Sequence, residues 1–170
     1  MKHNFKITFF LLAMFIVTQF IGLYVVNHYL QRGNELPFGM TPPEAEKESD
    51  FWTSFLPSII IAFIIAIVVL FLLMKFNAEV VLKAWFFLVI TIALGITFSS
   101  FLPDFGKKEF LVLILALPLA FFKIYQRHFI IHNATELLIY PGIAAVFVPM
   151  LNIWTIVILL ILISIYDMWA

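Results

Sequence analysis

The chain contains no cysteine and few charged residues. Of its 170 residues, 12% are Asp, Glu, Lys or Arg, whereas soluble globular domains carry roughly 25%. Without cysteine, the chain can form neither a disulfide nor a thiolate metal site, and it has no cysteine nucleophile. Its ten basic and ten acidic residues cancel, so no basic field attracts nucleic acid and we expect no nucleic-acid partner.

Apolar residues make up most of the chain instead. They reach 64% of the sequence, and 21 of the residues are Phe. The mean hydropathy is +1.11. A chain of this length cannot hide so much apolar surface from water, so we expect the lipid bilayer to be its solvent. The composition therefore predicts an integral, multi-pass membrane protein: an all-α, polytopic helix bundle in which residues 1–170 form a single membrane domain.

Apolar runs divide the chain into about six predicted transmembrane helices. Crossing the hydrocarbon core takes about 20 mostly apolar residues. The first run is too long for a signal peptide and no small-residue cleavage pattern follows it, so we interpret it as a retained span. The later runs are shorter, and Pro118 and Pro141 interrupt two of them, which is typical of helices packed inside a bundle. The predicted spans are 7–29, 55–76, 80–102, 110–125, 137–151 and 153–170.

Three further patterns concern how these helices are arranged and connected. Six Lys and Arg residues fall on the side of the N-terminus and four on the other, so the chain is predicted to have a cytoplasmic N-terminus. The 31–50 stretch is rich in Pro and Glu and is predicted to be a solvated extramembrane loop. Two pairs of small residues have the spacing of helix-packing faces: Ala62 with Ala66, and Ala116 with Ala120.

Asp167 is the only acid embedded in an apolar run, "ILISIYDMWA". A carboxylate in hydrocarbon is costly, so such residues usually mark function. In one interpretation Tyr166 and Trp169 form an aromatic belt, and Asp167 is solvated at the membrane–water interface. Against it, no Lys or Arg offsets the negative charges that would gather in this last helical turn. We therefore expect a helix cut off in mid-course, with Asp167 within the membrane.

A second group of polar residues lies before the fifth predicted span. His128, His132 and Glu136 are spaced four residues apart, so one continuous helix would place them on one face as a metal site. They fall in the connection "KIYQRHFIIHNATE", where the favoured interpretation is polar loop residues. Asn133 begins a glycosylation motif. The predicted orientation places this motif on the cytoplasmic side, which argues against glycosylation.

The last 38 residues of the chain, 133–170, carry a resemblance to a known family. "NATELLIYPGIAAVFVP", the short turn "MLN" and "IWTIVILLILISIYDMWA" are similar to the fifth and sixth spans of prokaryotic presenilin-like proteins, which belong with presenilin and signal peptide peptidase among the intramembrane aspartyl proteases. The cytoplasmic N-terminus and the long first outer loop are similar too. The resemblance implies that Asp167 is the first catalytic aspartate and that Tyr166 is a supporting or substrate-contact residue.

The sequence lacks two motifs that are typical of the family it resembles. The family has nine spans, with a second aspartate in a Gly-x-Gly-Asp motif and a Pro-Ala-Leu motif further on, and neither motif occurs here. Cleavage of a transmembrane helical substrate would therefore need C-terminal spans or a partner chain carrying the second Asp, and we expect residues 1–170 alone to be inactive. No metal or organic cofactor is expected.

Two other kinds of function stay open from the sequence. A six-span bundle suits a transporter or channel subunit in which Asp167 is a proton or cation site. It also suits a non-catalytic membrane scaffold. For this chain to cleave by itself, a two-fold homodimer would have to bring two Asp167 side chains together.

Overall fold

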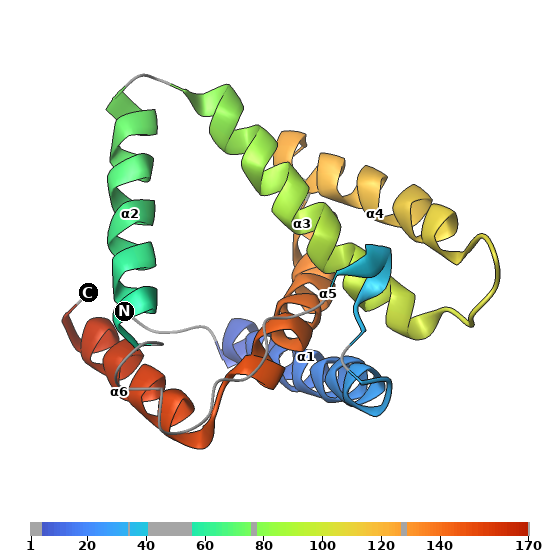
Figure 1. Cartoon of the computed structure of the whole chain (residues 1–170), viewed down its shortest axis with the longest axis horizontal. Coiled ribbons are helices and arrows are strands. Elements are labelled where there is room, and N and C mark those ends of the chain that lie inside the picture. The colour runs from blue at the N-terminus through green and yellow to red at the C-terminus, as the bar shows by residue number, and fades with distance from the viewer. Residues whose placement is uncertain (1–4, 34, 41–55, 76–77, 127–128, 170) are drawn as a thin grey trace.

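The computed structural model describes residues 5–33, 35–40, 56–75, 78–126 and 129–169 (Figure 1). Within these residues the chain is helical and has no β-strand, which confirms the predicted all-α class. Two 3₁₀ turns, η1 (Pro37–Gly39) and η3 (Val148–Met150), accompany the α-helices. These are α1 (Phe5–Gln31), α2 (Leu56–Lys75), α3 (Glu79–Phe101), α4 (Lys108–Tyr125), α5 (Phe129–Phe147) and α6 (Ile153–Trp169).

Three of the described helices are long and apolar enough to cross a membrane. By length and composition they are Ile7–Gln31 in α1, Glu79–Phe101, which is α3, and Phe129–Phe147, which is α5. Many of their large apolar side chains are exposed, among them Phe20 and Trp85. Apolar surface of this kind suits lipid and not water. The fold is therefore that of a helical membrane protein.

The fifth helix begins eight residues earlier than the sequence predicted. The predicted span was 137–151, after a polar connection, whereas α5 runs from Phe129 to Phe147. The prediction was wrong because polar residues alone do not end a helix: no Pro or Gly interrupts the chain between Phe129 and Tyr140, so nothing breaks the backbone hydrogen bonds there. At the other end, α5 passes into η3, which contains Pro149.

Helices α1, α3, α4 and α5, called here the four-helix body, pack together, while α2 and α6 extend away from them (Figure 1). The four-helix body has two apolar centres. One joins α1, α3 and α5 through Val25, Ile96 and Ala145. The other joins α3, α4 and α5 and includes Ala116 and Ala120, which are fully buried. This confirms that pair as a packing face; Ala62 and Ala66 lie in α2, and their side chains fall outside the described residues.

Helices α3 and α5 approach so closely that only glycine fits between them. A Cβ atom built on Gly142 would collide with the carbonyl oxygen of Ala93 and would lie 2.9 Å from Thr97 Oγ1. The Thr97 hydroxyl donates a hydrogen bond of 2.6 Å to the carbonyl oxygen of Leu138, one turn before Gly142. Small residues allow membrane helices to approach, and buried hydroxyls then bond across the contact.

Part of the loop predicted to be solvated instead folds back onto α3. Leu36 is buried, and its N–H donates to the carbonyl oxygen of Met40 over 3.1 Å. Phe38 has a left-handed backbone, with φ of 62°, which is uncommon for a bulky residue. A Cβ on Gly95 would lie only 3.2 Å from the Phe38 ring. Apolar residues Leu36 and Phe38 explain the difference, because docking on the helices buries them.

Candidate functional site

The predicted catalytic pair lies in the last helix. Tyr166 and Asp167 belong to the final turn of α6, which begins at Ile153 and ends at Trp169. Asn152 caps the start of this helix: its Oδ1 atom accepts hydrogen bonds from the backbone N–H of Thr155 (2.8 Å) and from its hydroxyl (2.9 Å). Such a cap satisfies backbone groups that a helix start leaves free. The side chains of Tyr166 and Asp167 lie outside the described residues.

Helix α6 stands apart from the four-helix body. It is joined to α5 through η3, and in Figure 1 it extends away from α1, α3 and α4. The backbone of α6, the helix that carries Asp167, therefore does not pack closely against the described helices of the four-helix body. Exposed apolar side chains along α6, including Leu160 and Ile161, leave this helix with surface that a membrane or further helices would cover.

A second polar cluster connects α4 to α5, and two of its members, His132 and Glu136, were predicted to be loop residues. The Nζ atom of Lys123 lies 3.2 Å from Oε1 of Glu136, and Nδ1 of His132 lies 3.2 Å from the same oxygen. Lys123 also donates to the backbone carbonyl of His132 over 3.4 Å. His132 and Glu136 share one face because α5 is continuous through both. The prediction that they lie in a loop was wrong.

This cluster does not amount to a metal site in the part of the chain that the structure describes. No group of three potential ligands comes together there, and His128 lies outside the described residues. The ammonium group of Lys123 is instead paired with the carboxylate of Glu136. A metal cation would have to displace Lys123 in order to bind there. The glycosylation motif at Asn133 is also unsuitable, because its third residue, Thr135, is fully buried within α5 and its hydroxyl donates to the Ile131 carbonyl.

Glu136 also reaches a groove between α1 and α5. The groove has a volume of about 410 Å³ and is mostly apolar, with Leu11, Met14 and Phe15 of α1 among its lining residues. Its polar members are Thr18, Gln19, Glu136 and Tyr140. A continuous α5 is what places Glu136 beside Tyr140, so a prediction that began this helix at residue 137 had no means of finding the groove.

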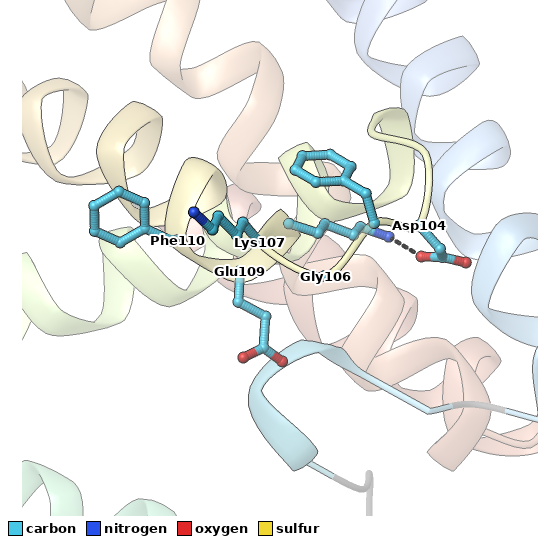
Figure 2. A pocket seen from close by; sticks show the side chains of 7 residues that line it. Asp104, Gly106, Lys107, Glu109 and Phe110 are labelled. Carbon is cyan, nitrogen blue, oxygen red and sulfur yellow. Dashed lines mark hydrogen bonds and ion pairs between the residues drawn. The ribbon is translucent and has the colours of Figure 1, made fainter.

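A third polar group lies at the opposite end of the four-helix body. Asp104, in the turn between α3 and α4, accepts hydrogen bonds from Arg32 (2.6 Å) and Lys108 (2.7 Å). These two cations hold the pKa of the Asp104 carboxyl below its ordinary value, with Lys108 making the larger contribution. Figure 2 shows this turn, where an open hollow of about 720 Å³ runs from Asp104 to Phe110. The ion pairs tie the end of α1 to the start of α4.

Comparison with protein-family models, with curated proteins and with solved structures finds no match for the chain. The class that the fold defines is an all-helical membrane protein with three helices able to span a bilayer.

Proposed function

We propose that this chain is the N-terminal part of an intramembrane aspartyl protease and that Asp167 supplies one of its two catalytic carboxylates. The observation that carries the proposal is the position of Tyr166-Asp167 in the helical backbone of α6, a mostly apolar helix with no other charged residue. A carboxylate placed in such a helix usually serves function. The separation of α6 from the four-helix body supports the proposal, because it leaves room for a helix bearing the second carboxylate.

In the proposed mechanism two facing carboxylates share one proton, because both cannot ionise at close range. The ionised carboxylate takes a proton from water as the water oxygen attacks the scissile carbonyl. The protonated carboxylic acid donates its proton to the carbonyl oxygen. The carboxyl group that took the proton from water then donates it to the leaving amine, while the other carboxylate takes a proton back from the tetrahedral diol as the C–N bond breaks. Asp167 fills one of these roles, and the pair titrates as a unit. Tyr166 lies about 100° around the helix from Asp167 and would contact substrate or support the site.

The proposed topology has six spans and a cytoplasmic N-terminus. Helix α2 supports it because its 20 residues contain one charged side chain, Lys75, at its end. Helices α4 and α6 are shorter, with 18 and 17 residues. Short helices cross a bilayer where neighbours or local thinning accommodate them. In this topology the acid at 167 lies toward the cytoplasmic end of the sixth span.

A transporter or channel subunit is the second candidate function, and one observation favours it. Glu136 and His132 lie inside α5, one of the helices long and apolar enough to span a membrane. Ionisable residues in such a helix are typical of proton and cation pathways. In this case the groove between α1 and α5, and not Asp167, would be the site of the chemistry.

The deciding experiment uses membranes that contain the chain together with its partner spans. A photoreactive transition-state analogue of peptide hydrolysis is expected to label the chain, and Asp167→Asn should abolish both labelling and cleavage of a helical membrane substrate. Glu109→Gln is the matched control, because Glu109 is exposed in the first turn of α4. Labelling that survives Asp167→Asn would refute the proposal. Ion or proton uptake that is lost in Glu136→Gln but kept in Asp167→Asn would favour the transporter.

A further inference from the structure

In the groove between α1 and α5, the carboxylate of Glu136 has one oxygen without a partner. The Nζ atom of Lys123 and the Nδ1 atom of His132 both contact the same atom, Oε1, each at 3.2 Å. The other oxygen, Oε2, makes no polar contact with a residue that the structure describes. Because Glu136 lines the groove, its carboxylate can accept a further hydrogen bond from a molecule that binds there.

Three more polar side chains of the groove also retain hydrogen-bonding capacity. Gln19 is exposed, and its amide makes no hydrogen bond within the described part of the chain. Tyr140 is exposed too, and its hydroxyl has no partner among the described residues. Thr18 donates to the carbonyl oxygen of Met14 over 2.8 Å, which leaves its own oxygen able to accept. Since an amide and a phenol both donate and accept, they suit a hydroxyl group, which does the same.

The groove is a site with an end and not a path through the protein. Its volume of about 410 Å³ is within the range of small-molecule sites. Its lining stops at Gln19 of α1 and Tyr140 of α5. Further along both helices, Val25 and Ala145 are buried in one apolar centre, so α1 and α5 pack together there. The remaining lining residues are apolar: Leu11, Met14, Phe15 and Leu137.

Charge and depth both favour an uncharged ligand. Lys123 already balances the charge of Glu136, and its side chain is only 13% exposed. A cationic ligand would meet Lys123 beside the carboxylate, and an anionic ligand would meet the carboxylate itself. Gln19 is twelve residues from either end of the apolar stretch Ile7–Gln31, which is about 18 Å along the helix. A charged group at that depth in hydrocarbon is costly.

We propose that the groove between α1 and α5 binds a neutral glyceride, a membrane lipid whose head group is an uncharged glycerol. Its hydroxyls donate to Glu136 and exchange hydrogen bonds with Gln19 and Tyr140, while its acyl chain covers the apolar lining. The bilayer is the source of this ligand, because Leu11 and Phe15 of the lining are 58% and 60% exposed and apolar surface of this kind suits lipid. The inference rests neither on Asp167 nor on the proposed protease.

Three photoreactive probes test the proposal in phosphatidylcholine vesicles that contain the full chain. The probes share one diazirine-bearing acyl chain and differ in the head group, which is a glycerol ester, an ammonium or a carboxylate. The glycerol probe is expected to label residues 11–19 and 136–140 saturably, and unlabelled monoacylglycerol should compete. Stronger labelling by either charged probe would overturn the proposal, and for the ammonium it would indicate a cation site. Equal, non-saturable labelling by all three would show general lipid contact only and would also overturn it.

Substitutions then test the groups that hold the glycerol. Tyr140→Phe removes a hydroxyl and keeps the ring, and Gln19→Leu removes an amide. Each is expected to weaken saturable labelling about three- to tenfold, which corresponds to one lost hydrogen bond. Neither polar group bonds to a described residue, so both variants should unfold at the wild-type temperature. Tyr125→Phe is the matched control, because Tyr125 is exposed on α4 and outside the groove. Wild-type labelling of both groove variants would refute the site.

Discussion

Gly142 of α5 lies directly against the backbone carbonyl of Ala93 in α3, with no room for a methyl group between them. This contact sets how closely the two helices pack, and the hydrogen bond from Thr97 to the Leu138 carbonyl depends on it. The position and tilt of α5, and with them Glu136 and the start of α6, follow from a contact between two backbones.

Replacing Gly142 with alanine is therefore expected to destabilise the protein. The added methyl group must push α5 away from α3, and overpacking of this kind costs about 1–3 kcal/mol. The measurement is the thermal unfolding of the detergent-solubilised protein. Gly106→Ala is the matched control, because a Cβ at Gly106 meets nothing within 4 Å. If both variants unfold at the wild-type temperature, that result would contradict the close packing of α3 against α5 at Gly142.

Thr97→Val tests the hydrogen bond across the same contact. The substitution keeps the shape of the side chain but removes the donor, so about 1 kcal/mol of stability should be lost. Thr97→Ser keeps the hydroxyl and should remain closer to wild type. Chemical unfolding of the three proteins in the same detergent compares them. A serine variant as unstable as the valine variant would point to packing of the methyl group and not to the bond.

The Lys123–Glu136 pair is expected to couple α4 to α5. Lys123→Gln and Glu136→Gln should each destabilise the protein, and the double variant should lose less than the sum. For partly exposed pairs such a cycle gives about 0.5–1 kcal/mol of coupling. The single and double variants are compared by thermal unfolding at low and high salt. Additive losses at low salt would mean that the 3.2 Å contact carries no energy.

The ion pairs of Asp104 should make one part of the stability depend on pH. The pKa of Asp104 is lowered from 3.8 by its hydrogen bonds to Lys108 and Arg32, so the folded state binds a proton less readily than the unfolded chain. The stability that the ionised Asp104 carboxylate contributes is fully present when the pH is above the pKa of this residue in the unfolded chain. It is lost as the pH falls through the lower pKa of the folded state. The unfolding temperature of wild type should therefore exceed that of Asp104→Asn at pH 6, and the difference should shrink below about pH 4.

The sequence was sufficient to predict helices, because long apolar runs without frequent Gly or Pro have few alternatives in a membrane. It was also sufficient to mark Ala116 and Ala120 as a packing face. The start of α5 was predicted wrongly, because the polar residues His132 and Glu136 were interpreted as part of a loop. The α3–α5 contact was missed for another reason. In a membrane both the lipid-facing and the inward-facing sides of a helix are apolar, so hydropathy does not show that Gly142 meets Ala93.

The candidate site was only partly accessible to the same reasoning. Asp167 stood out because it is an acid in an apolar run, and its place in the final turn of α6 agrees with the predicted helix. Its role as a catalytic residue stays a prediction. The cluster of Lys123, His132 and Glu136 required knowledge of which helices are neighbours, since Lys123 and Glu136 are 13 residues apart and on different helices.

The contact between Phe38 and Gly95 has a consequence for how this protein can change over time. Phe38 keeps its strained backbone, and its ring lies 3.2 Å from where a Cβ at position 95 would be. A larger residue at 95 is tolerated only if the residue at 38 becomes smaller or the turn moves away. Among any relatives of this chain, positions 38 and 95 should therefore covary in size, although 57 residues of sequence separate them.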